Sequence, residues 1–401
     1  MKKNCDVCKS KLSGKIISLG SQPLCDDLKR INSIKKNKLF KIDLRICKKC
    51  LTVNQLHKIN QETLFPKKYN YRAGLTQDVK NGMINLVNKV DRLINKKSKA
   101  VLDIGCNDGT LLNFFEKKNY KTFGIEPTNA FKDCNKKHVI YNKYFNKDTV
   151  EKILKQRKFI DVVTFTNVFA HITNFDQLIN DLKILVKNVN YLVIENHYLG
   201  SILEKNQFDT FYQEHPRTYS VKSFLFISKL IDMNLEKIEF PKRYGGNIRV
   251  YYSHNKKKYK ISKILKKEKD FIKKFNKLDK KINDWKLNKA KTIRELINKN
   301  YKIFGKAFPG RASILINLLG LDKNIISCIF EQDNSPKNFH YVPGTKIQIL
   351  PDQNMKKLLK KDSIILNFAW HISYEIKKYL RKKGIKNKII DILSNKDFKK
   401  I

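Results

Sequence analysis

Short apolar runs alternate with helix-period stretches through the middle of the chain. Between residues 76 and 250 the apolar runs have the length of buried strands, and amphipathic segments separate them. This alternation is typical of βαβ units around a parallel sheet. The predicted strands are Ala100–Ile104, Lys121–Ile125, Ile160–Thr166 and Tyr191–Glu195, with a helix over Leu111–Lys117.

The flanking regions have different patterns. Residues 1 to about 75 contain short strand-like runs such as Phe40–Ile46. Residues 255–300 place apolar residues at helical spacing among many lysines, which predicts one or two amphipathic helices. Strand–helix alternation then resumes, with strands at Tyr301–Phe304, Ser363–Leu366 and Lys388–Leu393. We therefore predict an α/β protein of three parts: a small module over 1–75, a central domain over 76–250, and a helical linker with a second α/β domain over 251–401.

Lysine dominates the charge. The 401 residues carry 84 Lys+Arg against 37 Asp+Glu, a formal net charge of +47. Basic faces bind nucleic acid by releasing counterions, but these lysines are spread through every region and accompany many Asn and Ile residues, which share A/T-rich codons. We favour codon bias with a solvated surface; a field for an anionic ligand is the alternative. No apolar run approaches the ~20 residues of a membrane span, so we expect a cytoplasmic protein with no membrane or nucleic-acid partner.

Four of the eight cysteines form two C-x-x-C pairs near the N-terminus, Cys5 with Cys8 and Cys47 with Cys50. Two such pairs are typical of a tetrahedral zinc site with four thiolate ligands, which leaves no coordination position for water. We therefore predict a structural zinc ion. A redox dithiol is the alternative, and Cys25, between the pairs, is a less favoured fifth thiol.

A glycine loop follows the first predicted strand of the central domain. Residues Val101–Thr110 read VLDIGCNDGT, a strand that ends in D-x-G-x-x-x-G and continues into a helix. Gly105 and Gly109 would let the backbone approach a ligand closely. Glu126, at the tip of the next predicted strand, is placed to accept hydrogen bonds from both hydroxyls of a ribose.

This loop favours S-adenosylmethionine over a dinucleotide. It lacks the G-x-G-x-x-G spacing that holds a pyrophosphate. Asp103 at its head would repel phosphate and would suit the ammonium group of a methionine. We therefore predict S-adenosylmethionine as the cofactor, bound by Asp103, Gly105, Gly109 and Glu126; NAD and a turn without a ligand are the alternatives.

Short blocks along nearly the whole chain match one family in order and spacing. They are Leu19–Leu24, Leu64–Tyr71, Asn167–His171, Asp209–His215, Gly310–Asn317, Asp333–Asn334, Val342–Thr345 and Asn367–Ile372. With the cysteine pairs and the glycine loop, they resemble the C-methyltransferases that act on nucleoside-diphosphate-linked keto-deoxysugars. The resemblance implies a zinc-binding module, a class I S-adenosylmethionine-dependent methyltransferase domain with a Rossmann-like sheet, and a C-terminal Rossmann-like domain.

The resemblance also implies the catalytic roles. His215 would remove the sugar proton alpha to the ketone, and histidine has an unperturbed pKa that suits a base. Tyr212 would donate a hydrogen bond to the developing enolate, and Glu214 would orient the site. His171 would be a second polar group near the reacting carbons. The tyrosines of the first module, Tyr69 or Tyr71, would close over the substrate.

Further contacts follow from the same resemblance. Asn167 would contact the cofactor, and the nucleotide-sugar substrate would contact Asn196, Arg249, Arg311 and Asp333. Structural alternatives are a helix cap for His171, core packing for the two tyrosines and a surface position for Arg311. His197 and His371 are interpreted as structural.

The chain departs from the family pattern at several positions. Tyr244 and Asn247 stand where members often have His and Ser, Ala73 stands where Ser is common, and Glu195–Tyr198 replaces a more apolar run. These positions flank the expected sugar site. The departures therefore concern the substrate more than the reaction.

The predicted function is transfer of a methyl group from S-adenosylmethionine to a sugar carbon of a nucleotide-linked keto-deoxysugar, by a monomer or weak oligomer. An O- or N-methyltransferase of another small molecule, which needs no enolisation, is the first alternative. A basic zinc-containing RNA methyltransferase or RNA-binding protein is the second. It predicts aromatic and basic residues interleaved on one face, which the sequence lacks.

Overall fold

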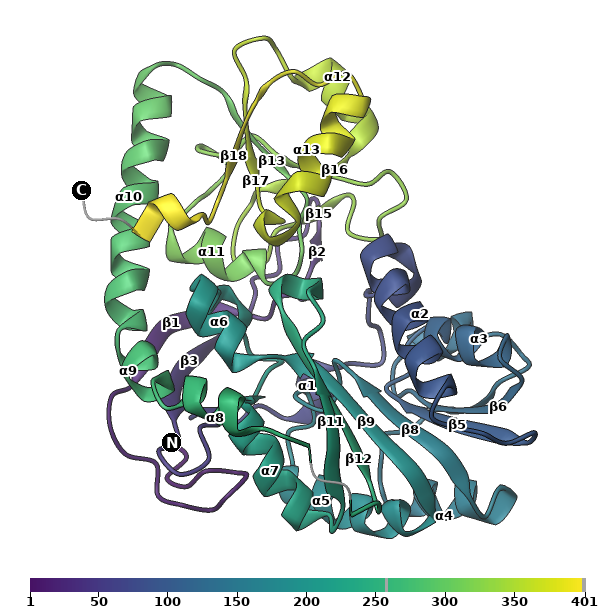
Figure 1. The fold of residues 1–401 in the computed structure, drawn as a ribbon. Helices are drawn as coiled ribbons and strands as arrows, with labels where there is room; N and C mark the ends of the chain where they lie inside the picture. Colours follow the sequence, from purple (N-terminus) through teal and green to yellow (C-terminus); the bar gives the residue numbers. More distant parts are fainter. Residues whose placement is uncertain (257–258, 399–401) are drawn as a thin grey trace. The chain divides into compact units, whose positions relative to one another are not determined.

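The computed structural model describes residues 1–256 and 259–398 and divides the chain into two compact units (Figure 1). The first unit consists of residues 1–14, 45–202 and 214–272. The second consists of residues 15–44 and 203–213 and of the chain from 273 onward. Both units are therefore assembled from separate stretches of the sequence.

A seven-stranded sheet forms the centre of the first unit, in the order β11-β12-β9-β8-β5-β6-β7. β5 to β9 are parallel, whereas β12 is antiparallel to both β9 and β11. The four strands predicted for the central domain are confirmed as β5, β6, β8 and β9. The bounds are Lys99–Ile104 (β5), Tyr120–Ile125 (β6), Val139–Tyr141 (β7), Ile160–Thr166 (β8), Val189–His197 (β9), Asn234–Glu239 (β11) and Asn247–Ser253 (β12).

The strand order reverses between β5 and β8. The chain continues from β5 to β6 and β7 on one side, and β8 and β9 lie on the other side. In open α/β sheets, ligands bind outside the carboxyl ends of the strands at such a switch point. The loops after β5 and β8, which contain Gly105 and Asn167, both begin there.

Helices surround this sheet. α2 buries Val79, Met83, Leu86, Val87 and Val90, one apolar stripe at helical spacing. α6 and α9 end in the second unit. The helices span Gln61–Leu64 (α1), Gln77–Asp91 (α2), Thr110–Glu116 (α3), Lys147–Gln156 (α4), Phe175–Leu185 (α5), Leu199–Lys205 (α6), Val221–Leu230 (α7), Ser262–Glu268 (α8) and Phe271–Asn276 (α9), with 3-10 turns at Ala73–Leu75, Asn129–Asp133, Val186–Asn188 and Arg243–Gly245.

A small ladder joins the N-terminal part of the first unit to the segment that follows His215. β4 (Val53–Gln55) pairs antiparallel with β10 (Arg217–Thr218). β10 begins two residues after His215. The second cysteine pair, Cys47 and Cys50, immediately precedes β4, so the pairing of β4 with β10 brings it close to the segment that contains His215.

The second unit has its own seven-stranded sheet, in the order β18-β17-β13-β14-β16-β15-β2. Its five strands from β18 to β16 are parallel, and β15 is antiparallel to both β16 and β2. β1 pairs antiparallel with β3. The bounds are Ile17–Pro23 (β1), Lys29–Arg30 (β2), Leu39–Ile46 (β3), Ile303–Lys306 (β13), Ile329–Glu331 (β14), His340–Tyr341 (β15), Gln348–Pro351 (β16), Ile364–Asn367 (β17) and Lys388–Asp391 (β18).

The sequence predicts one or two helices in the lysine-rich segment over 255–300. The structure has three helices there, so the predicted number was too low. Residues 257–258 lie outside the described residues. α8, α9 and α10 are separated by short breaks, and the longest of them buries Trp285 and Ile282. The helices of the second unit are Leu278–Asn298 (α10), Ala312–Leu318 (α11), Met355–Leu358 (α12) and Ser373–Lys382 (α13), with 3-10 turns at Phe208–Thr210, Asp352–Asn354, Trp370–Ile372 and Asn395–Phe398.

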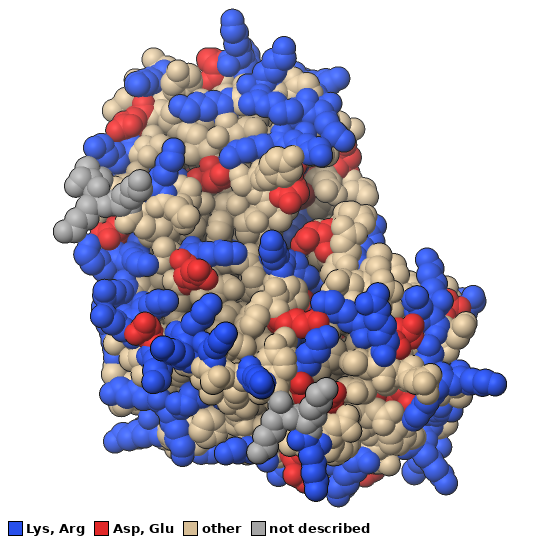
Figure 2. Space-filling model, in the orientation of Figure 1, with Lys and Arg blue, Asp and Glu red and all other residues tan. Residues whose placement is uncertain are grey.

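The surface charge is dispersed on the face that Figure 2 shows, where acidic residues lie among the lysines and arginines. This distribution agrees with a solvated surface better than with one concentrated binding patch on that face. No helix in the described part of the chain combines the length and the apolar character needed to cross a membrane. The predicted mixed α/β fold, with parallel sheets and an N-terminal four-cysteine cluster, is confirmed.

Candidate active site

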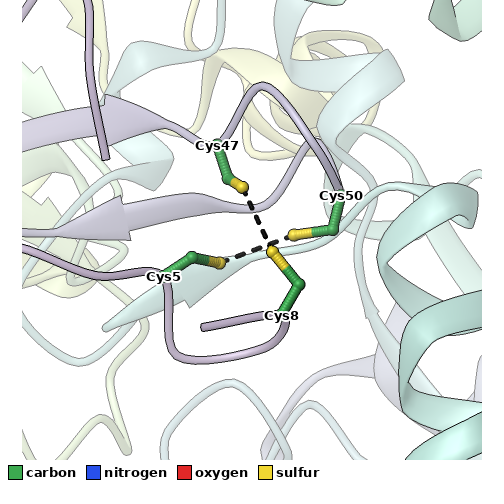
Figure 3. Close-up of side chains that lie close together, drawn as sticks. All are labelled: Cys5, Cys8, Cys47 and Cys50. Atoms are coloured by element: carbon green, nitrogen blue, oxygen red, sulfur yellow. Dashed lines mark hydrogen bonds between the residues drawn. The ribbon is translucent and has the colours of Figure 1, made fainter. Parts of the chain in front are cut away.

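The four predicted zinc ligands converge at the N-terminus of the first unit (Figure 3). All four Sγ atoms lie within 4.8 Å of one another, with Cys5 and Cys50 separated by 3.5 Å and Cys8 and Cys47 by 3.4 Å. Tetrahedral zinc with Zn–S bonds of about 2.3 Å requires sulfur separations of roughly 3.8 Å. The cluster therefore fits zinc with a filled coordination sphere. Cys25 belongs to the second unit.

Hydrogen bonds connect the cysteine cluster to the segment that contains His215. The Gln55 side chain donates to the His215 carbonyl (3.0 Å), and the Gln55 backbone N–H donates to Pro216 (2.9 Å). The carbonyl of Cys50 accepts from the hydroxyls of Ser220 and Ser223. Gln55 of β4 and Cys50 of the cluster thus hold the two ends of the segment from His215 to Ser220.

The predicted cofactor loop adopts the conformation that its glycines permit. Gly105 and Gly109 both have φ of +73°, in the left-handed region. A Cβ at Gly105 would lie 2.5 Å from a methyl group of Val168, and one at Gly109 would lie 3.1 Å from Cys134 Sγ. The loop after β5 therefore packs directly against the loop after β8, without room for a side chain between them.

Asp103 is buried at the end of β5, where its carboxylate accepts a hydrogen bond from the Thr164 hydroxyl (2.7 Å). Burial raises the pKa of Asp103 to about 7, against the opposing effect of that hydrogen bond. A carboxyl group with this pKa can ionise fully when an ammonium group arrives. This property suits the predicted role beside the methionine part of the cofactor.

Glu126 lies at the tip of β6, as predicted. Its Oε2 accepts from the Asn107 backbone (3.0 Å), and its Oε1 accepts from the backbone (2.9 Å) and hydroxyl (2.6 Å) of Thr128. Burial raises its pKa, although these hydrogen bonds oppose the shift. The carboxylate is therefore held rigidly beside the glycine loop.

The block that contains Tyr69 and Tyr71 lies against the cofactor loop. Asn107 accepts from the Ala73 backbone (2.9 Å) and donates to the Tyr71 carbonyl (3.1 Å). Asp108 accepts from the backbone of Gly74 (2.8 Å). The segment that leaves the cysteine module is thus fixed to the glycine loop, which brings both tyrosines to the cofactor side of the sheet.

Seven rings from distant parts of the first unit form a continuous series, which we call the ring arc. The first part begins at Tyr69, whose ring lies 5.7 Å from Phe65. Phe65 stacks on His171 (5.1 Å), and His171 stacks on His215 (4.9 Å, 28° between planes). The Tyr69 hydroxyl also donates to Glu214 (3.4 Å). Four of the predicted catalytic residues therefore lie together.

The second part of the ring arc continues from His215 to His197 (5.1 Å) and from His197 to Tyr244 (5.7 Å). It ends where the hydroxyls of Tyr244 and Tyr71 share a hydrogen bond of 3.1 Å. Burial raises the pKa of both tyrosines. Both phenols are therefore neutral at physiological pH.

Burial, together with the nearby charge of His215, lowers the pKa of His171 well below its ordinary value. His171 is therefore neutral at pH 7. If His215 takes up a proton, its positive charge therefore does not lie against a second positive charge at His171. Tyr212 belongs to the second unit and is half-buried there.

Two asparagines lie at the carboxyl ends of β8 and β9. Asn167 has a φ of +57°, accepts a hydrogen bond from Asn247 (3.1 Å) and donates its backbone N–H to the Glu195 carbonyl (2.7 Å). Asn196 accepts from the Ala170 backbone (3.4 Å). Both asparagines line a cavity with a volume of about 10 Å³, together with Ala170, His197, His215, Arg217 and Thr218.

Arg249, predicted to contact the substrate, is fully buried in an ion-pair network. Its guanidinium donates to Glu195 (2.7 Å) and to Glu239 (3.2 Å), and Arg243 forms a second ion pair with Glu195 (3.1 Å). Burial alone would raise the pKa of Glu195, but the two arginines outweigh it and lower the pKa. In this structure Arg249 holds Glu195, and Glu195 in turn accepts from Asn247 (3.0 Å).

The remaining predicted residues lie in the second unit. Arg311 is buried and binds Asp209 through two hydrogen bonds (2.8 and 2.6 Å), while Trp370 donates to the same carboxylate (2.9 Å). Asp333 is exposed and accepts from the Gln353 backbone (2.7 Å). Burial lowers the pKa of His371 to about 3, with a contribution from Arg311.

Models of three protein families match the chain in succession. They are described as "Putative zinc binding domain" over residues 5–65, "Methyltransferase domain" over residues 80–230 and "C-methyltransferase C-terminal domain" over residues 242–390. The four-cysteine cluster lies within the first match and the switch point of the first sheet within the second. The zinc-binding module, the methyltransferase domain and the C-terminal domain expected from the sequence are thus each matched by a family model.

A curated relative of this chain is "C-methyltransferase NovU" from Streptomyces niveus, 26% identical over 251 residues. The match covers 62% of this chain, and it spans 60% of the length of NovU. Similar solved structures include the plantazolicin methyltransferase BpumL with S-adenosylhomocysteine (15% identity, TM-score 0.35, 45% of this chain and 86% of BpumL). Another is a SAM-dependent methyltransferase from Archaeoglobus fulgidus (17% identity, TM-score 0.34, 43% of this chain and 94% of that protein).

Sequence reasoning did not place three residues that the structure brings into this candidate site. His197 was interpreted as structural, yet it lies in the ring arc next to His215. Tyr244 and Asn247 were noted only as departures from the family pattern, and their hydrogen bonds join Tyr71 and Asn167 to the rest of the site. One signal was available: His197 follows the predicted strand Tyr191–Glu195, whose carboxyl end lies at the same sheet edge as Asn167.

Proposed function

We propose that this protein transfers a methyl group from S-adenosylmethionine to a carbon of a nucleotide-linked keto-deoxysugar, with His215 as the base. One observation supports this most. The loop after β8 packs on the cofactor loop at Val168 and, three residues later, stacks His171 on His215 (4.9 Å). An imidazole base and the predicted methyl-donor site therefore lie at one sheet edge within the first unit.

Methylation of carbon requires a carbanion equivalent, so a C–H bond beside the ketone must break first. His215 accepts this proton, and the electron pair of the C–H bond moves through the new C=C bond to the ketone oxygen. His171, which is neutral, offers no charge that would oppose protonation of its neighbour. Glu214, hydrogen-bonded to Tyr69, orients that side of the site.

The chain's own residues fit the cofactor. Asp103 would hold the ammonium group, Glu126 the ribose hydroxyls, and the backbone at Gly105 and Gly109 the centre of the molecule. When bound, S-adenosylmethionine supplies a methyl group whose C–S bond breaks as the new C–C bond forms. The site residues contribute by holding the cofactor and the substrate in the correct relative orientation, because orientation lowers the barrier of such a transfer.

Support for the nucleotide-linked keto-deoxysugar is less direct. It comes from the family resemblance of the sequence blocks, and the positive net charge suits a diphosphate. In this proposal zinc is structural, because four cysteine sulfurs fill its coordination sphere.

The test is incubation with labelled S-adenosylmethionine and a panel of thymidine-diphosphate- and other nucleotide-linked 4-keto-sugars. Label should enter a sugar carbon. His215→Asn should abolish turnover while S-adenosylmethionine binding stays intact, because only the proton acceptor is removed. His254→Asn is the matched control, since His254 is exposed and bonds the carbonyl of Val186. Turnover of an O- or N-methylated product that survives His215→Asn would refute the proposal.

A further inference from the structure

Two buried amide groups at the candidate site have no hydrogen-bond acceptor. The Nδ2 atoms of Asn167 and Asn196 are both shielded from solvent and unpartnered. Asn196 as a whole is only 2% exposed. Both residues line the cavity of about 10 Å³ that His215 and His197 also line. Buried donors without acceptors are rare in native proteins, and such a group calls for a ligand or a water.

The hydrogen-bond network fixes how each amide is turned. The Oδ1 atom of Asn167 accepts from Asn247, and the Oδ1 atom of Asn196 accepts from the Ala170 backbone. In each side chain the oxygen is therefore occupied, and the NH₂ group remains as the available donor. Asn247 is itself held by the ionised Glu195, so the orientation of Asn167 rests on a charged, buried anchor.

The groups that line this cavity and its volume indicate what can bind in it. Two NH₂ donors bind an acceptor, and a volume of about 10 Å³ holds about one oxygen atom or one water. The acceptor must lie beside His215, the proposed base. A ketone oxygen of the substrate has these properties.

We propose that Asn167 and Asn196 form a donor pair for the oxygen that becomes the enolate; this inference rests on the proposed function. When the C–H bond breaks, its proton goes to a ring nitrogen of His215 and negative charge develops on the oxygen between the two amides. When the carbon then takes the methyl group, the electron pair returns from the oxygen and the C=O bond re-forms. Preorganised donors of this kind stabilise the charge at the step where it develops.

The experiment measures enolisation apart from methyl transfer. The enzyme is incubated in D₂O with S-adenosylhomocysteine and the keto-sugar that the wild type methylates, and deuterium entering the alpha carbon is followed by mass spectrometry. Asn167→Asp and Asn196→Asp keep the acceptor oxygen but remove the donor. Asn135→Asp is the matched control, because Asn135 is exposed and its oxygen accepts from the Lys137 backbone.

Each donor-removing variant should slow the exchange by about 10²–10³-fold, as the loss of one oxyanion donor does in other enzymes. S-adenosylhomocysteine binding should be unchanged in Asn196→Asp, and Asn135→Asp should match the wild type in both exchange and binding. If one variant does not fold, the other decides. Exchange within threefold of the wild type in the folded variants, with wild-type exchange intact, would overturn the donor pair alone. Absence of exchange in the wild type would overturn the proposed function and this inference with it.

Discussion

Arg217 connects the cysteine cluster to the loop that contains His171. Its guanidinium bonds Asp6, which lies between Cys5 and Cys8 (2.8 Å), and the backbone carbonyls of Ile172 and Thr173 on the other side. The Arg217 side chain is fully buried, and that of Asp6 is 17% exposed. Replacing the arginine by methionine keeps the apolar stem and removes every one of these contacts.

The magnitude follows from burial. Removal of one partner from a buried ion pair costs about 3–5 kcal/mol, because the other charge stays buried without compensation. Asp6 is partly exposed and keeps an ion pair with Lys2 (2.7 Å), so the cost lies at the lower end of this range. Ile172 and Thr173 are half-buried, so water can replace the lost donors at their carbonyls. We therefore expect Arg217→Met to lower the free energy of unfolding of the first unit by about 3–4 kcal/mol.

Hydrogen exchange of peptides that contain β4 and β10 provides the measurement, because β10 begins at Arg217 and β4 pairs with it. Lys9→Met is the matched control: it breaks the ion pair with Asp176, whose side chains are 57% and 69% exposed. Exposed pairs contribute about 0.2–1 kcal/mol. If Arg217→Met destabilised these strands no more than Lys9→Met does, the structural connection described here would be wrong.

Three further predictions follow from single residues. Since burial raises the pKa of Asp103 to about 7, its carboxylate fraction grows as the pH rises through that value. S-adenosylmethionine should bind several-fold more tightly by calorimetry at pH 7.4 than at pH 6.0, and Asp103→Asn should flatten this dependence. Gly105→Ala places a Cβ 2.5 Å from a valine methyl. In chemical denaturation it should lower the free energy of unfolding by about 1–3 kcal/mol more than Gly20→Ala does. Gly20 is the matched control, because it has nearly the same φ but open space around its Cβ position. Arg311→Met leaves Asp209 buried without its partner and should cost about 3–5 kcal/mol in denaturant unfolding followed by tryptophan fluorescence, since both tryptophans belong to the second unit.

The predictable part of the fold was the part with local signals. β5, β6, β8 and β9 are apolar runs bounded by turns, and their parallel pairing follows from the helices between them. β12 was not recognised, although every residue in it is buried. Its sequence contains Asn247 and Arg249, polar residues whose buried partner, Glu195, is more than fifty positions away. The hydrophobic periodicity of a sequence cannot show that polar residues are buried because they pair with a residue far away in the chain.

The second unit illustrates the same limit. Lys29 and Arg30 form the two-residue strand β2, which pairs with β15 more than three hundred positions later. Two basic residues in succession do not predict a strand. For this reason the sequence did not distinguish residues 15–44 from the rest of the N-terminal module. The cysteine cluster was predictable because ligand spacing within each C-x-x-C pair is local.

The candidate site was predictable as a set of residue types but not as an arrangement. A Tyr-Gln-Glu-His run in the sequence suggests acid–base chemistry, yet it contains no information about what stacks on the histidine. His171 and His197 come from the ends of two different strands, and only the strand order places them on either side of His215. The pKa of His171 falls because tertiary packing removes it from water. Such a shift has no signature in the sequence.

The charges of the first unit are arranged to orient neutral groups at the reaction centre. Glu195 is ionised and fully buried, but Arg243 and Arg249 balance it, and its contact toward the site is the amide of Asn247. That amide holds Asn167. A charge placed directly at the ketone would bind the substrate and the enolate very differently from a fixed dipole. In the proposed reaction, an amide held in place by a distant carboxylate would need no reorganisation when the ketone oxygen becomes negative, and this property would lower the barrier to enolisation.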